Sequence, residues 1–263
     1  MKDQWRLIDT GPGSAAFNMA LDEAMASDVM RGASPPTLRF YTWAVPSVSI
    51  GCFQRAGEID LEYCRCNSIP LVRRPTGGRA ILHHVELTCS FSGRNNIPVF
   101  SGGLLRTYGS LSRAFYRAFR GVGLDVEIKT RREKGRVLTG SPLCFQSVSY
   151  GEISLGGKKV MGSAQKRWKE GFLQQGSIKL RVNPEEMEKV FMDAGRDGIL
   201  SSMTGILDYL PGLDPADLKE RIREAFEEIF EVKLTPLRVT DSERDLALDL
   251  LKKYRSQEWT FRR

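Results

Sequence analysis

The order of hydrophobic patterns along the chain is the feature that most constrains its fold. Segments with the composition of β-strands gather in the middle, over 37–53, 69–93 and 150–180, whereas helical periodicity dominates both ends. The regular alternation of strand and helix that a doubly wound parallel sheet requires is missing. The pattern therefore predicts an α+β fold with a mixed, mainly antiparallel central sheet flanked by helices.

Four segments have the apolar spacing of amphipathic helices. The first covers 14–31, with Ser14 as the expected N-cap, and the second covers 104–120. The third begins after Asp214, where Pro215 occupies the first helical position, and the fourth runs from Asp241 to Tyr254. We expect the two C-terminal helices to pack on the sheet.

Two glycine-rich turns separate neighbouring strand candidates. Thr76-Gly77-Gly78 joins the strand candidates 69–75 and 79–93. Gly156-Gly157-Lys158 lies between 150–155 and 159–168, which together predict a hairpin.

Composition excludes several classes of protein. The chain has 263 residues, no apolar run near the roughly 20 needed to cross a bilayer, and no signal-peptide pattern at its start. We therefore expect a single cytoplasmic domain over 1–263. Five cysteines and a cytoplasmic location argue against disulfides. His83 and His84 would face opposite sides of a strand, and no other ligand set has zinc spacing, so no metal is expected.

A net charge of +7 attracts acidic partners, although charge alone does not distinguish nucleic acid, membrane and protein. No basic motif interleaved with aromatic residues supports nucleic-acid binding.

Two basic motifs could carry chemistry. The first places two glycines, whose backbone can approach a ligand closely, among arginines that suit a phosphate or carboxylate. It comprises Arg73, Arg74, Thr76, Gly77, Gly78 and Arg79. A tight hairpin with solvent-facing arginines explains it equally well. The second places a lysine before small residues that leave room for a chain-like ligand, although a polar hairpin is the commoner case. It comprises Lys159, Gly162, Ser163 and Ala164.

Taken together, these segments resemble the lipoate–protein ligase and octanoyltransferase family of the biotin/lipoate ligase superfamily. The resemblance rests on WRLIDTGPGSAAFNMALDEAM, RRPTGGRAILH, GKKVMGSAQKR and KYRSQEWTFRR, and covers nearly the whole chain. It implies a biotin/lipoate ligase-like catalytic domain, with a family core over about residues 34–240, in which His83 helps to bind substrate. His84 departs from the family, which often has Asp there.

The subfamily follows from two further positions. ATP-dependent lipoate ligases usually carry a third glycine where this chain has Arg79, and they need no nucleophilic cysteine. Cys144 precedes the lysine hairpin, as in the octanoyltransferases of the Gram-positive type. The resemblance implies that Cys144 carries the acyl group as a thioester, and that the Lys159 ammonium stabilises its thiolate.

This reading implies octanoyl-acyl carrier protein as donor and a lysine of a lipoyl domain or glycine-cleavage H protein as acceptor. It needs no cofactor and predicts a monomer that binds neither nucleic acid nor membrane. Two alternatives stay open: an ATP-dependent lipoate or octanoate ligase, and a non-catalytic binding protein on the same fold.

Overall fold

The structure is a computed structural model that describes residues 3–129, 151–192 and 195–262 of the chain. The helices of three turns or more and the shorter helical segments are α1 (Ala15–Arg31), α2 (Leu61–Cys66), α3 (Gly103–Gly121), α4 (Pro184–Val190), α5 (Arg196–Ser202), α6 (Pro215–Phe230), α7 (Asp241–Arg255) and α8 (Gln257–Phe261). The strands are β1 (Gln4–Gly13), β2 (Thr37–Trp43), β3 (Ser47–Ile50), β4 (Leu71–Arg73), β5 (Ile81–His83), β6 (Glu86–Arg94), β7 (Val126–Ile128), β8 (Ile153–Leu155), β9 (Lys158–Arg167), β10 (Gly171–Lys179) and β11 (Lys233–Pro236).

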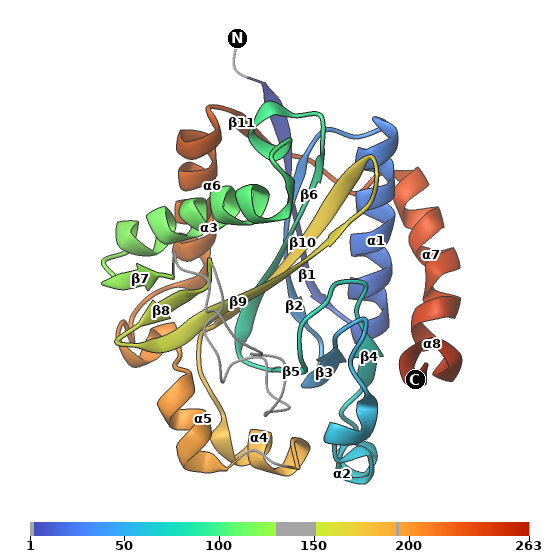
Figure 1. The fold of residues 1–263 in the computed structure, drawn as a ribbon, viewed down its shortest axis with the longest axis vertical. Helices are drawn as coiled ribbons and strands as arrows, with labels where there is room; N and C mark the ends of the chain where they lie inside the picture. The colour runs from blue at the N-terminus through green and yellow to red at the C-terminus, as the bar shows by residue number, and fades with distance from the viewer. Residues whose placement is uncertain (1–2, 130–150, 193–194, 263) are drawn as a thin grey trace.

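The larger of two sheets has the strand order β11-β1-β2-β6-β10-β9-β8-β7 (Figure 1). β1 runs parallel to both β11 and β2, whereas all neighbouring pairs from β2 to β7 are antiparallel. α1 connects β1 to β2 and supplies the long crossover that two parallel neighbours need. The predicted α+β class and the mainly antiparallel mixed sheet are confirmed.

Helices cover both faces of this sheet, with α3 and α6 on one side and α1 and α7 on the other (Figure 1). Alternating residues of β2 serve the two layers. Phe40 joins the apolar cluster that contains Phe115 of α3 and Phe226 of α6, whereas Tyr41 joins the cluster formed with α1 and α7. The hydroxyl of Ser14 accepts a hydrogen bond from the Phe17 amide, and so caps α1 as predicted.

The smaller sheet has the strand order β4-β3-β5. β3 pairs in parallel with β4 and antiparallel with β5, so the strands around Thr76-Gly77-Gly78 do not form a hairpin with each other. The predicted strand over 79–93 is divided at His84 and Val85, because β5 belongs to the small sheet and β6 to the large one. The hairpin interpretation of the first glycine-rich turn is therefore wrong, and the turn instead spans two strands that flank a third.

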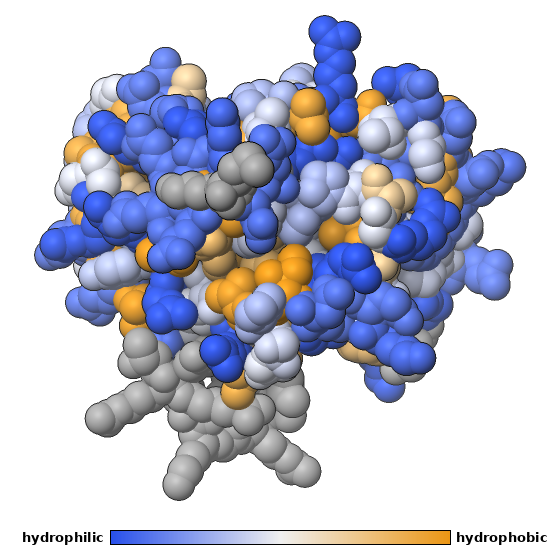
Figure 2. Space-filling model, turned by 90° about the horizontal axis from the view of Figure 1, so that it is seen from above, coloured by the Kyte–Doolittle hydropathy of each residue, from blue (hydrophilic) through white to orange (hydrophobic). Residues whose placement is uncertain are grey.

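Segments from both ends of the chain contribute to one layer, since α7 packs on α1 and α8 lies against β4. In the described part of the chain, none of the helices combines the length and the apolar character needed to cross a bilayer. Seen from above, the surface is mainly hydrophilic, with a small group of hydrophobic side chains near the middle of the view (Figure 2).

Candidate functional site

A pocket lies between the two sheets, with a volume of about 380 Å³ including the part open to solvent. Its accessible surface is almost entirely apolar, which suits a hydrocarbon chain. The described residues that line it are Met19, Tyr41, Trp43, Ser49, Arg74, Ile81, His83, Thr88, Gly162, Ser163, Ala164, Gln175, Gly176 and Ser177. The pocket thus brings together residues from both basic motifs of the sequence.

Small residues on β9 and β10 form one wall. Gly162 and Ser163 pair with Ser177 and Gly176 in the antiparallel ladder. A Cβ atom at Gly176 would lie 2.7 Å from the Met161 methyl carbon and 3.2 Å from the Cys89 sulfur. A larger side chain at Gly176 therefore has no room without displacing its neighbours.

Arg74 shapes the glycine loop on the opposite side of the pocket. Its guanidinium donates hydrogen bonds to the carbonyl oxygens of Gly77 and Arg79, and to the Ser49 hydroxyl at 3.1 Å. Gly51 packs directly beneath this loop, because a Cβ atom there would lie 1.8 Å from the Gly78 carbonyl oxygen. The loop is therefore fixed by the Arg74 side chain and by its close packing against the Gly51 backbone.

Arg73 is fully buried and lies outside the pocket lining. Its Nη1 donates to the carbonyl oxygens of Gly51, Cys52 and Gln54, and its Nε donates to two carbonyl oxygens of α8. Of the two interpretations of this motif, the one with solvent-facing arginines is wrong for Arg73 and Arg74, which are both buried. Arg73 instead ties α8 to the backbone beside the glycine loop.

Thr76 and Arg79 occupy different environments in the same loop. The buried Thr76 hydroxyl donates to the Gln175 side-chain oxygen at 2.7 Å, which links the loop to β10. Arg79 is half-buried, and its carbonyl oxygen is one of the acceptors for Arg74.

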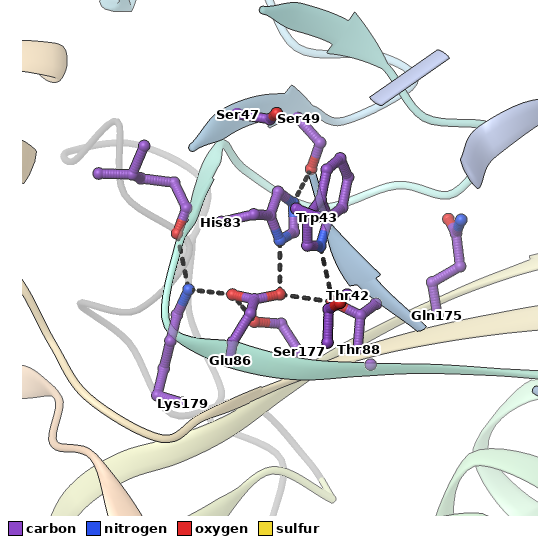
Figure 3. A network of polar contacts seen from close by, with 12 residues as sticks. Thr42, Trp43, Ser47, Ser49, His83, Glu86, Thr88, Gln175, Ser177 and Lys179 are labelled. Carbon is purple, nitrogen blue, oxygen red and sulfur yellow. Dashed lines mark hydrogen bonds and ion pairs between the residues drawn. The ribbon is translucent and has the colours of Figure 1, made fainter. Parts of the chain in front are cut away.

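His83 is the centre of a buried polar network (Figure 3). Its Nε2 lies 2.7 Å from the Ser49 hydroxyl, and its Nδ1 lies 2.7 Å from the Glu86 carboxylate. The indole of Trp43 stacks on the imidazole, with ring centroids 3.8 Å apart. The ring is therefore fixed at both nitrogens and on one face. The adjacent His84 lies beyond the end of β5 and is exposed, so the two histidines occupy different environments.

Glu86 accepts hydrogen bonds from three further groups besides His83. The Lys179 ammonium lies 2.5 Å from one carboxylate oxygen, the Ser177 hydroxyl donates to the same oxygen at 2.9 Å, and the Thr88 hydroxyl donates to the other at 2.5 Å. The Lys179 ammonium also donates to the Leu82 carbonyl oxygen at 2.7 Å. Both oxygens of this buried carboxylate therefore have hydrogen-bond donors, and its charge is paired.

The electrostatics of the network follow from this arrangement. Burial lowers the pKa of the His83 imidazole below its usual value, against the opposing influence of Glu86. Burial disfavours the charged form of Glu86, but the neighbouring His83 and Lys179 outweigh it and hold the pKa of that carboxyl well below its usual range. The two shifts favour the ionised Glu86 carboxylate and, above its lowered pKa, the neutral form of the His83 imidazole.

Lys159 is completely buried at the start of β9, and its ammonium lies 2.5 Å from the carboxylate of Glu152. Lys159 is not among the residues that line the pocket. Cys144, the expected partner of Lys159, lies outside the described residues. Glu152 was not predicted, although it stands directly before β8 in the sequence.

The four cysteines of the described residues are free thiols. Cys52, Cys64 and Cys89 are buried, and Cys66 is exposed. Burial raises the pKa of the Cys64 thiol to about 11, and burial likewise raises that of Cys89 well above its usual range. These two sulfurs remain protonated at neutral pH and are poor nucleophiles.

Sequence reasoning missed Trp43, Ser49, Glu86 and Lys179. One signal could have revealed part of the network, because polar residues alternate along β6 at Glu86, Thr88, Ser90 and Ser92. All four are buried, and the alternation of side chains in a strand places them on one face of β6.

Comparison with known proteins connects this geometry to a family. Residues 14–227 match the lipoyl protein ligase A/B catalytic domain. Octanoyltransferase LipM of Kyrpidia tusciae is 40% identical over 98% of this chain and 99% of its own, and octanoyltransferase LipM of Moorella thermoacetica is 37% identical over 99% of each chain. A crystal structure of lipoate-protein ligase A bound with ATP superposes with a TM-score of 0.82 at 25% identity, covering 99% of both chains.

Proposed function

Since the chain belongs to the lipoyl protein ligase A/B catalytic domain family, we propose that it is an octanoyltransferase of lipoate biosynthesis. It moves an octanoyl group from acyl carrier protein to a lysine of a lipoyl domain or of the glycine-cleavage H protein. The observation that carries this proposal is the similarity to octanoyltransferases over 98% of the chain at 40% identity. The apolar pocket between the two sheets supports it, because an eight-carbon chain needs such a lining.

The reaction proceeds through a thioester on Cys144. The Cys144 thiolate attacks the donor thioester, the bond from the acyl carbon to the carrier sulfur breaks, and the acyl group moves to Cys144. This exchange between thioesters costs little free energy. The acceptor amine then attacks, and the stable amide product drives the transfer forward. Donor and product differ only in which atom holds the acyl group, so no ATP and no metal are required.

Lys159 favours the thiolate in this scheme, because a buried ammonium near a thiol stabilises the charged sulfur. The Glu152 carboxylate at 2.5 Å holds the Lys159 ammonium in the core of the sheet. Backbone N–H groups around Gly77, Gly78, Gly162 and Ser163 are the candidates for binding the acyl carbonyl oxygen.

The surface charge fits the two macromolecular partners. A net charge of +7 favours association with acidic proteins, and we propose that both acyl carrier protein and the lipoyl domain present acidic surfaces to it. The protein acts as a monomer in the cytoplasm.

A lipoate or octanoate ligase is the second candidate, favoured by the likeness to lipoate-protein ligase A bound with ATP. The two candidates differ in their donor. The transferase uses octanoyl-acyl carrier protein without nucleotide, whereas the ligase uses free octanoate with ATP and Mg²⁺.

Incubation with octanoyl-acyl carrier protein, followed by intact mass measurement, tests the proposal. We expect one octanoyl adduct on the enzyme without ATP, its transfer to an added lipoyl domain, and loss of both events in Cys144→Ala and Cys144→Ser. Cys66→Ser is the matched control, because Cys66 is the exposed cysteine among those described. Turnover that requires ATP and free octanoate would establish the ligase instead. An adduct that persists in Cys144→Ala would disprove the role of Cys144.

A further inference from the structure

Amide formation raises a problem that the acyl-enzyme scheme leaves unsolved. A lysine side chain has a pKa near 10.4, so the acceptor arrives as an ammonium and must lose a proton before it can attack. A base near the acyl group must accept that proton. Lys159 is poorly suited, because its ammonium is engaged in the buried ion pair with Glu152.

The lining of the pocket leaves few groups that can act as a base. Among the described lining residues, Arg74 stays charged at neutral pH and therefore cannot accept a proton. The Tyr41 phenol donates to the Asp22 carboxylate at 2.9 Å, and burial raises its pKa well above the usual value. His83 is the remaining described lining residue with a nitrogen that can take up a proton near neutral pH.

The hydrogen bonds determine which nitrogen of His83 is available. The Glu86 carboxylate can only accept, so His83 Nδ1 must carry a hydrogen and donate it at 2.7 Å. In the neutral ring, Nε2 is then an acceptor, and the Ser49 hydroxyl 2.7 Å away donates to it. The Ser49 oxygen in turn accepts from Arg74 at 3.1 Å. The arrangement is a directed chain from the pocket through Ser49 to His83 and Glu86 (Figure 3).

We propose that His83 is the general base for the acceptor lysine, and that the proton reaches it through the Ser49 hydroxyl. This inference rests on the proposed octanoyltransferase function. The ammonium of the acceptor gives a proton to the Ser49 oxygen while the Ser49 hydrogen passes to His83 Nε2. The amine nitrogen then forms a bond to the acyl carbon, the bond from that carbon to sulfur breaks, the departing sulfur takes the proton held by His83, and the nitrogen releases its second proton to solvent.

Glu86 and Lys179 act as positioning residues. The Glu86 carboxylate keeps the hydrogen on Nδ1 and stabilises the imidazolium that forms during transfer. Lys179 on β10 and Arg74 after β4 oppose that positive charge, so His83 binds the proton only transiently. The groups that β2, β3 and β9 present to the imidazole and the pocket are uncharged, including Trp43 and Ser49.

The test separates acyl loading from acyl transfer. The enzyme is loaded from octanoyl-acyl carrier protein, freed of donor, and mixed with either a lipoyl domain or hydroxylamine, a small amine that is already unprotonated at neutral pH. Loss of the octanoyl adduct is followed by intact mass. The variants are His83→Gln and Ser49→Ala, and the control is His84→Gln, which changes the exposed neighbour.

We expect His83→Gln to slow transfer to the lipoyl domain about 100-fold more than it slows loading or the reaction with hydroxylamine. Its lysine transfer should recover at alkaline pH, where the acceptor amine loses its proton unaided. Ser49→Ala, which leaves His83 and Glu86 in place, should show the same selective loss to a smaller degree, and His84→Gln should match wild type.

Equal slowing of hydroxylamine and lysine would overturn the inference, because it would indicate general damage to the pocket. Wild-type lysine transfer by both His83→Gln and Ser49→Ala, or an acyl ester on Ser49, would also overturn it. Absence of any adduct on the wild-type enzyme would instead reject the proposed function itself.

Discussion

The Glu86→Gln substitution removes a buried negative charge while keeping the size of the side chain. Lys179, whose side chain is 5% exposed, would then keep its positive charge without its carboxylate partner. Breaking a buried ion pair by removing one partner costs about 3 kcal/mol at the lower end of measured values. We use the lower end because the Lys179 ammonium keeps its hydrogen bond to the Leu82 carbonyl oxygen and can also donate to the amide oxygen of the new glutamine.

A loss of this size should lower the melting temperature by roughly 6 to 12 °C for a domain of this length. Urea unfolding followed by circular dichroism measures the same free energy, with the slope against urea as a check on the denatured state. The partner variant Lys179→Met, and the double variant, complete a double-mutant cycle. We expect the unfolding free energy lost in the double variant to be smaller than the sum of the two single losses, by more than about 1.5 kcal/mol.

The matched control is Glu62→Gln, which breaks the ion pair with Arg65 at a site where both side chains are about four-fifths exposed, 80% and 78%. This control should leave the unfolding midpoint unchanged, because solvent screens such pairs. The reasoning is refuted if Glu86→Gln is no more destabilising than Glu62→Gln, or if the double-mutant cycle shows no coupling.

Three further outcomes follow from the structure. Gly176→Ala places a methyl group 2.7 Å from the Met161 methyl carbon, so it should destabilise the protein by about 1 to 3 kcal/mol. It should also slow the transfer of octanoyl more than the transfer of a four-carbon acyl group, as measured by kcat/KM for each donor. Arg73→Lys removes hydrogen-bond donors to carbonyl oxygens of two segments, so it should lower the unfolding free energy measured in urea by about 2 kcal/mol. It should also expose the C-terminal residues to carboxypeptidase, and unchanged stability would contradict the structural role of Arg73. Burial lowers the pKa of His83 in the folded state, so unfolding takes up a proton as the pH falls below about 6.5. The unfolding free energy should therefore decline below that pH in the wild type and in His84→Gln, and should decline less in His83→Gln.

The elements with strong local signals were predictable from sequence. The first helix was expected over 14–31 and is observed at Ala15–Arg31, and the strand expected over 37–43 is observed at Thr37–Trp43. Both depend on apolar periodicity and on end signals that lie within the segment itself. The central mixed sheet followed from the clustering of such strands.

The missed elements lack those local signals. β1 ends in Gly11-Pro12-Gly13, a sequence typical of turns, and it is extended because β2 and β11 pair with it from distant parts of the chain. α2, α4 and α5 have six or seven residues each, too few to show helical periodicity. Tertiary pairing, not local propensity, decides these segments.

The sequence motifs predicted which segments form the site, but they did not predict which side chains contact one another. The two motifs indicated which segments meet at the pocket, whereas the partners of His83 depend on strand order. Glu86 and Lys179 face each other because β6 pairs with β10, with Lys179 directly opposite Glu86 in the ladder. Ser49 reaches His83 because β3 pairs with β5 in a second sheet. No pattern along the sequence encodes that arrangement.

The polar network joins the two sheets as well as serving the pocket. His83 and Leu82 belong to the small sheet, while Glu86 and Lys179 belong to the large one. The His83–Glu86 hydrogen bond and the bond from Lys179 to the Leu82 carbonyl oxygen cross between them. A substitution at His83 therefore changes both the relative anchoring of the sheets and the chemistry at the pocket. Stability alone cannot separate these two contributions. The ratio of lysine transfer to hydroxylamine transfer can, because both acceptors use the same pocket and only the lysine requires a base.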